Sequence, residues 1–75
     1  METVYIKTEY IKLDQLLKYS GIVENGAMAK YIIKDGNINV NNQVCIQRGK
    51  KIYPNDIVEI KNHGSIIVKI NKGID

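Results

Sequence analysis

Residues 36–60 read GNINVNNQVCIQRGKKIYPNDIVEI, and this stretch contains strand and turn signals that indicate the fold class. Over residues 38–40, isoleucine and valine alternate with asparagine, which is the period of a half-buried strand. The pair Asn41-Asn42 tolerates the positive φ angles of a tight turn, and an apolar segment at residues 44–46 follows it. The pattern therefore predicts a β-hairpin near the middle of the chain.

The sequence leaves the register of this hairpin open. A two-residue loop would place Val40 opposite Gln43 and turn Val44 to the other face of the sheet. Beyond the hairpin, Pro54-Asn55 suits a turn. We expect two further strands at residues 57–61 and 66–70, joined by a turn at residues 62–65.

Two short helices are expected upstream of the hairpin. From Leu13 to Tyr19, leucines recur at i, i+3 and i+4, and Gly21 is placed to end the helix in a left-handed conformation. The second helix begins after Asn25, a good N-cap residue, and runs to about Asp35. Its expected buried stripe comprises Ala29, Ile32 and Ile33.

Together with a short edge strand at residues 3–7, these elements predict an α+β fold in which two short helices pack on a small, mainly antiparallel sheet. The expected order is strand, helix, helix and four short strands. The 75 residues suffice for one small domain. With fourteen isoleucines and neither Phe nor Trp, the core should be aliphatic, and the five tyrosines should add bulk to it while their hydroxyls stay in water.

The residues also argue against several classes of protein. A lone cysteine, Cys45, cannot close an intramolecular disulfide, and neither a signal peptide nor a run of about 20 apolar residues is present. We therefore expect a cytoplasmic, monomeric protein with no contact with the membrane. His63 has no second metal-ligating residue near it, and no catalytic triad, phosphate-binding glycine loop or paired carboxylates occur, so we expect no metal, no cofactor and no enzymatic activity.

The net charge of +3 is local. Residues 1–20, 21–36 and 54–75 each hold equal numbers of acids and cations, which leaves Arg48, Lys50 and Lys51 as the whole excess. A concentrated cationic tract on a small sheet-rich domain is typical of a surface that binds a phosphate backbone, although a basic loop can also be a solubilising surface.

Residues 11–60 resemble the RNA-binding domain first recognised in ribosomal small-subunit protein four, the S-four-like or alpha-L domain. The matching pieces are the ordered set Lys12-Leu13-Asp14, Leu17, Gly21, Ala29 with Ile33, residues 36–41 and residues 55–60. The segments Gly26-Ala27-Met28-Ala29-Lys30 and Arg48-Gly49-Lys50-Lys51 look most like stand-alone bacterial members. Two turns that usually contain glycine read Asn41-Asn42 and Asn55-Asp56 here, and the Ser-Arg opening often seen on the second helix reads Asn25-Gly26.

The resemblance implies one domain over residues 1–75, with the family core at 11–60 and flanking strands at 3–7 and 65–70. It further implies a non-enzymatic accessory factor that binds structured RNA, ribosomal or transfer RNA, with the ribosome itself as a further expected partner. DNA is the less expected partner, and RNA would be recognised by shape rather than sequence. The implied RNA-binding residues are Lys12 and Lys18 from the first helix, Lys30 and Lys34 from the second, and Arg48, Lys50 and Lys51 from the loop after the hairpin.

One alternative from another class stays open. The asparagine turns and the strand at residues 57–60 also look like a small β-grasp protein-interaction module. The sulfur carriers of that class work through a C-terminal Gly-Gly, whereas this sequence ends Lys72-Gly73-Ile74-Asp75. Only a non-catalytic protein-binding role would therefore remain for this alternative.

Overall fold

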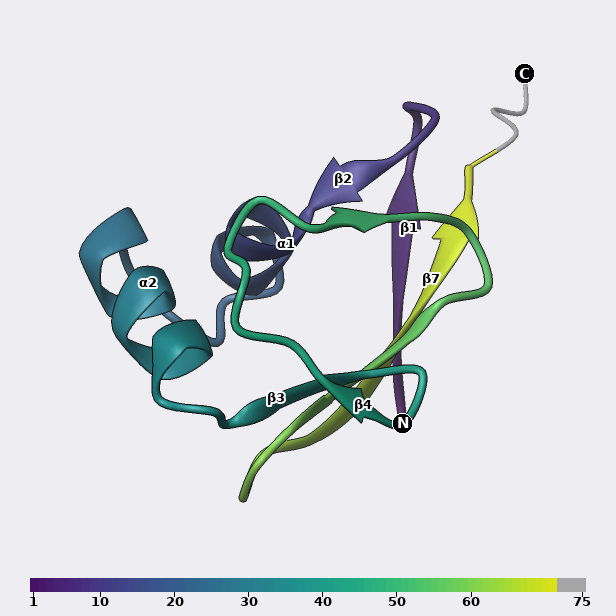
Figure 1. The fold of residues 1–75 in the computed structure, drawn as a ribbon. Helices are drawn as coiled ribbons and strands as arrows, with labels where there is room; N and C mark the ends of the chain where they lie inside the picture. Colours follow the sequence, from purple (N-terminus) through teal and green to yellow (C-terminus); the bar gives the residue numbers. More distant parts are fainter. Residues whose placement is uncertain (72–75) are drawn as a thin grey trace.

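A computed structural model describes residues 1–71 of the chain. Its main sheet has five strands in the order β1-β7-β6-β3-β4 (Figure 1). The strands are β1 (Glu2–Ile6), β3 (Ile38–Val40), β4 (Gln43–Val44), β6 (Ile57–Ile60) and β7 (Gly64–Ile70). The edge strand β1 runs parallel to β7 and the other pairs are antiparallel, so the predicted mainly antiparallel α+β fold is confirmed.

Both helices form where the sequence predicts them, as α1 (Leu13–Tyr19) and α2 (Gly26–Lys34). Gly21 follows α1 with a φ of 83°, a left-handed conformation that glycine adopts without steric cost. The side chain of Asn25 caps α2, because its Oδ1 accepts a hydrogen bond of 2.9 Å from the backbone N–H of Met28. The two helices pack against each other, with α2 on the outer side of α1 (Figure 1).

The hairpin has the two-residue register. Val40 pairs with Gln43, and Asn41 and Asn42 have φ angles of 50° and 72°, as a tight turn with two left-handed residues requires. Val44 consequently points away from the core and is 65% exposed. The expected return strand at residues 44–46 is wrong in its bounds, since β4 ends at Val44 and exposed Ile46 lies beyond the strand.

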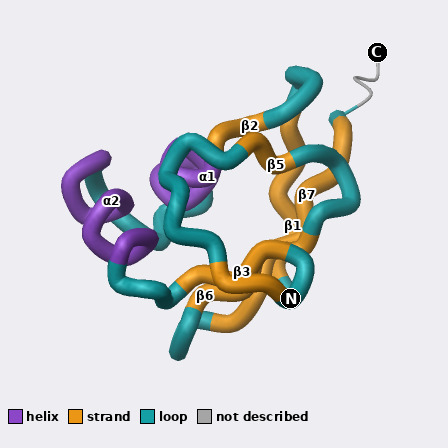
Figure 2. The backbone as a smooth tube through the Cα atoms, viewed as in Figure 1, coloured by secondary structure: helices purple, strands orange, loops and turns teal. Residues whose placement is uncertain are grey.

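A second, two-stranded sheet departs from the expected order of elements. It pairs β2 (Ile11–Lys12) with β5 (Lys51–Ile52), and it lies at the end of β1 opposite to the β3–β4 hairpin (Figures 1 and 2). Lys12 therefore precedes α1 instead of belonging to it, and Lys51 lies in a strand instead of a loop. This small sheet brings residues 48–51, which we call the basic segment, to the start of α1.

The core is aliphatic, as expected. The largest side chains with essentially no exposed surface are Leu13, Leu16, Leu17, Ile33, Ile38, Ile52, Val58, Ile66 and Val68. The second helix buries Ala29 and Ile33 fully but Ile32 only in part, so the predicted stripe is narrower than expected.

The expectation that tyrosines fill the core is wrong. Tyr31 and Tyr19 are 75% and 67% exposed, Tyr5 and Tyr53 are also exposed, and Tyr10 is half-buried. Branched aliphatic side chains already fill the space between the helices and the sheet, so the rings lie at positions that face outward. Four of the five tyrosines are thus exposed at the surface.

Candidate nucleic-acid interface

Helix α1 begins without a capping side chain. Its N-cap residue is Lys12, which has extended backbone angles and makes no side-chain cap hydrogen bond, because an ammonium group cannot accept one. Backbone carbonyls of the basic segment replace the cap. The N–H of Leu13 donates to the carbonyl oxygen of Lys50 at 2.8 Å, and the N–H of Asp14 donates to that of Arg48 at 3.0 Å. The basic segment is therefore fastened to the start of the helix.

The basic segment itself folds as a tight turn. The N–H of Lys50 donates to the carbonyl oxygen of Gln47 at 3.1 Å, which places Arg48 and Gly49 at the tip. All the side chains from Gln47 to Lys51 are exposed. The backbone of the turn is thus held by hydrogen bonds while its cationic side chains face solvent.

The pairing of β2 with β5 places Lys51 close to another lysine and to an aromatic ring. Lys12 and Lys51 are directly opposite each other, and both are exposed. Like charges in such a cross-strand pair repel. The Nζ of Lys51 lies 4.9 Å from the centroid of the Tyr10 ring, where the negative face of the ring attracts the ammonium. We call the group Lys12, Arg48, Lys50 and Lys51 the cationic corner.

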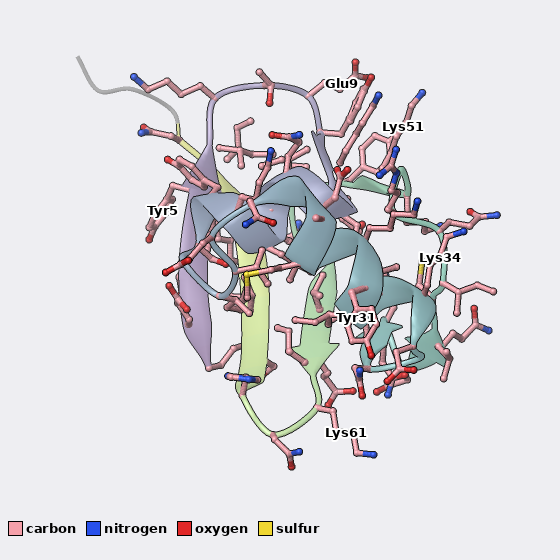
Figure 3. The ribbon with its side chains drawn as sticks, turned by 90° about the vertical axis from the view of Figure 1, so that its left-hand side faces the viewer. Tyr5, Glu9, Tyr31, Lys34, Lys51 and Lys61 are labelled. Atoms are coloured by element: carbon pink, nitrogen blue, oxygen red, sulfur yellow. The ribbon has the colours of Figure 1, made fainter. Side chains whose placement is uncertain are left out.

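The other three cations of the predicted site lie outside the cationic corner. Lys18 is in the last turn of α1 and half-buried, about 9 Å along the helix axis from Lys12. Lys30 and Lys34 are exposed and share one face of α2. In Figure 3, Lys34 and Lys51 project from the same edge of the molecule, whereas Lys61 lies at the opposite end from Lys51. The predicted residues therefore divide into a compact corner and more distant helix lysines.

Asp56 connects the hairpin turn at Asn41 to the turn that begins at Tyr53. Its Oδ1 accepts a hydrogen bond of 3.0 Å from the Asn41 side chain, and its Oδ2 accepts one of 2.8 Å from the N–H of Tyr53. The Oδ1 of Asn41 in turn accepts from the N–H of Ile57 at 2.9 Å. These bonds link the hairpin turn to the segment that follows β5.

Sequence reasoning missed Tyr10 and Tyr53 as neighbours of the site. Their ring centroids are 5.7 Å apart with a tilt of 49°, and the two residues flank the β2–β5 pair. Lys12 was an available signal for the contact between the basic segment and α1. A lysine at the start of a predicted helix leaves the first N–H groups without a side-chain acceptor, so water or backbone carbonyls of another segment accept from them.

The described residues offer little for other chemistry. Over residues 1–71, no three His, Cys, Asp or Glu side chains gather in a way that could hold a metal ion. His63 is exposed in the turn between β6 and β7, and Cys45 is half-buried with its Sγ 3.6 Å from the carbonyl oxygen of Gln47. Within the same range, neither α1 nor α2 has the length and apolarity needed to span a membrane.

Comparison with known proteins identifies the family. The sequence profile described as S4 domain matches residues 4–69, so the chain belongs to the S4 domain family, and the resemblance seen in the sequence motifs is confirmed. The match extends beyond residues 11–60 into β1 and β7. The chain is also 38% identical over 65 residues to the probable ribosome maturation protein RlbA of Bacillus subtilis (strain 168), and the alignment covers 87% of this chain and 92% of that protein.

Proposed function

We propose that this protein binds structured RNA, ribosomal or transfer RNA, through the cationic corner, Lys18 of α1 and the two lysines Lys30 and Lys34 of α2. We propose further that it acts without catalysis as an accessory factor of the ribosome or of RNA metabolism. The observation that carries the proposal is the capping of α1 by the carbonyl oxygens of Arg48 and Lys50. This capping holds the backbone of the corner in place, so its side chains need less ordering when they meet phosphates.

The electrostatics of the corner support an anionic ligand. Lys12 and Lys51 repel each other in the free protein, and a phosphate group between or beside them would remove that cost. Arg48 offers a planar guanidinium that can grip a phosphate through two parallel hydrogen bonds. A polyanion with regularly spaced phosphates satisfies both requirements.

The exposed cations and the comparisons favour RNA among polyanions. A-form RNA is recognised mainly through phosphates and 2′-hydroxyl groups, and exposed lysine and arginine side chains can bind both. The S4 domain family and the name of the Bacillus subtilis relative, a probable ribosome maturation protein, point the same way.

A pair of charge-matched variants tests the proposal. Lys50→Glu and Lys61→Glu each lower the net charge by two, and both replace an exposed lysine, but only Lys50 belongs to the cationic corner. We expect Lys50→Glu to weaken binding to an RNA hairpin with an A-form stem by about tenfold or more, and Lys61→Glu by less than about threefold. Fluorescence anisotropy measures the affinities, and circular dichroism checks that both variants fold.

Equal losses in the two variants would show that overall charge, rather than the cationic corner, attracts RNA. Failure of the parent protein to bind the hairpin at low salt would reject RNA binding and leave a protein-interaction role. If the parent protein does bind the hairpin, crosslinking in cells followed by sequencing of the bound RNA would identify which RNA it contacts.

A further inference from the structure

Two tyrosines flank the cationic corner in a fixed arrangement. Because Ile11 pairs with Ile52, the next residues outward along the two strands are Tyr10 and Tyr53, and their rings meet with centroids 5.7 Å apart. One face of Tyr10 is occupied by the ammonium of Lys51, 4.9 Å from the ring centroid. Tyr10 is half-buried, whereas Tyr53 remains 42% exposed.

We propose that the exposed ring of Tyr53 is a stacking site for an unpaired nucleobase of the bound RNA, with Lys51 next to it on the phosphate of the same or the neighbouring nucleotide. The inference rests on the proposed RNA-binding function and adds to it. It assigns a preference for helices interrupted by a bulge or junction over perfect duplexes.

The position of Tyr53 is held from two sides before any ligand binds. Its backbone N–H donates to the Oδ2 of Asp56 at 2.8 Å, and its ring lies against that of Tyr10. A rigid ring loses little conformational entropy when a base stacks on it, which makes it a better platform than a freely rotating side chain. Most of the other exposed tyrosines lack this setting, since Tyr31 lies on α2 and Tyr5 lies on β1.

The chemistry of the pair Tyr53 and Lys51 fits one nucleotide. Single-stranded RNA is bound by aromatic rings that stack on bases and cations that meet the backbone, and every base has a face that can stack. The Lys51 ammonium already lies over the Tyr10 ring, and that ring contacts Tyr53, so a base stacked on Tyr53 would have its phosphate within reach of the corner. A bulged nucleotide brings an unstacked base and duplex phosphates to the same place.

Two RNA hairpins with the same stem provide the test, one fully paired and one with a single bulged 2-aminopurine nucleotide. The parent protein should bind the bulged hairpin more tightly, and stacking should quench the 2-aminopurine fluorescence. In Tyr53→Leu, which keeps apolar bulk against Tyr10, affinity for the bulged hairpin should fall by about tenfold while affinity for the paired hairpin stays the same. Tyr53→Phe should behave like the parent, because stacking needs the ring and not the hydroxyl.

The matched control is Tyr31→Leu, which removes an even more exposed ring from α2 and should leave both affinities unchanged. The inference is overturned if the parent binds the two hairpins equally, if Tyr53→Leu keeps the preference and the quenching, or if it loses affinity for both hairpins alike. Tight binding of both hairpins without a preference would leave the proposed function standing and remove only the stacking site. Binding of neither hairpin would remove both.

Discussion

Four asparagines adopt the left-handed backbone conformation in turns of this chain. They are Asn41, Asn42, Asn55 and Asn62, which are the non-glycine residues with positive φ among residues 1–71. Asparagine tolerates the left-handed region better than other side chains because its short amide can bond locally. The amide of Asn41 bonds to Asp56 and Ile57, and the Oδ1 of Asn55 accepts from the Nζ of Lys69 at 2.9 Å. Asparagine therefore takes the left-handed positions in both turns that usually contain glycine in the family pattern.

At one residue of the hairpin turn, a substitution should raise the stability of the protein. Asn42 has a φ of 72° and is exposed, and Asn-Gly is the preferred pair for this kind of turn. Asn42→Gly should therefore stabilise the protein by about 0.5 kcal/mol, measured by urea unfolding, because glycine adopts this φ without a steric penalty. Asn42→Ala should destabilise it by about 1 kcal/mol. A glycine variant less stable than the parent would show that the Asn42 side chain makes a contribution beyond its backbone angle.

The buried face of α2 depends on one large side chain. Ile33 has no exposed surface, so Ile33→Ala should cost about 2–5 kcal/mol through lost burial and the cavity that remains. Ile32→Ala, at a half-buried position, should cost less than half as much. Urea unfolding measures both changes. The folded molecules of Ile33→Ala should bind RNA with the same affinity as the parent. A lower affinity of these folded molecules would show that Ile33 contributes to RNA binding.

Among the helices and strands, the sequence predicts those that have a periodic pattern of apolar residues or a recognisable capping or turn residue. The helices follow from leucine spacing, Asn25 and Gly21, and the β3–β4 turn follows from two asparagines. The strands β2 and β5 have two residues each, which is too short for alternation to be recognised. They form because the turn of the basic segment caps α1 and brings Lys51 beside Lys12, a long-range contact that no local pattern encodes.

The candidate site was predictable in its composition but not in its arrangement. Charge counting singles out Arg48, Lys50 and Lys51 because no acid lies near them in the sequence. The place of Lys12 in the same group depends on β2–β5 pairing, and the surface position of Tyr53 depends on how completely aliphatic residues fill the core. Both are outcomes of tertiary packing.

The proposed role of the two α2 lysines in RNA binding can be tested separately from the structural role of that helix. Lys30 and Lys34 share an exposed face, while Ala29 and Ile33 are buried on the other. Lys30→Glu with Lys34→Glu should weaken RNA binding, because two anions would face the phosphates, and should change stability by less than about 0.5 kcal/mol, since glutamate keeps good helix propensity. Anisotropy titration and urea unfolding check the two effects. Binding equal to the parent at low salt would confine the site to the cationic corner.

At the scale of the whole molecule, the cations of the proposed surface are spread over elements that lie far apart in the sequence. The corner joins β2, the start of α1 and β5, and α2, which carries Lys30 and Lys34, packs against α1 (Figure 1). Binding through such a surface should be governed by the number of phosphates neutralised, because each releases condensed counterions. The salt dependence of affinity therefore reports the size of the surface.

The claim that the cationic corner binds RNA through phosphates is best tested by the salt dependence of binding to an RNA hairpin. The comparison is between the parent and the variant with Arg48, Lys50 and Lys51 all changed to Ala. If about five of the seven cations meet phosphates, log affinity against log salt should have a slope near −4 for the parent and near −2 for the variant. The variant should bind more weakly by about 2 kcal/mol or more at low salt while it remains folded. A parent slope near zero, or the same slope for both proteins, would contradict the account.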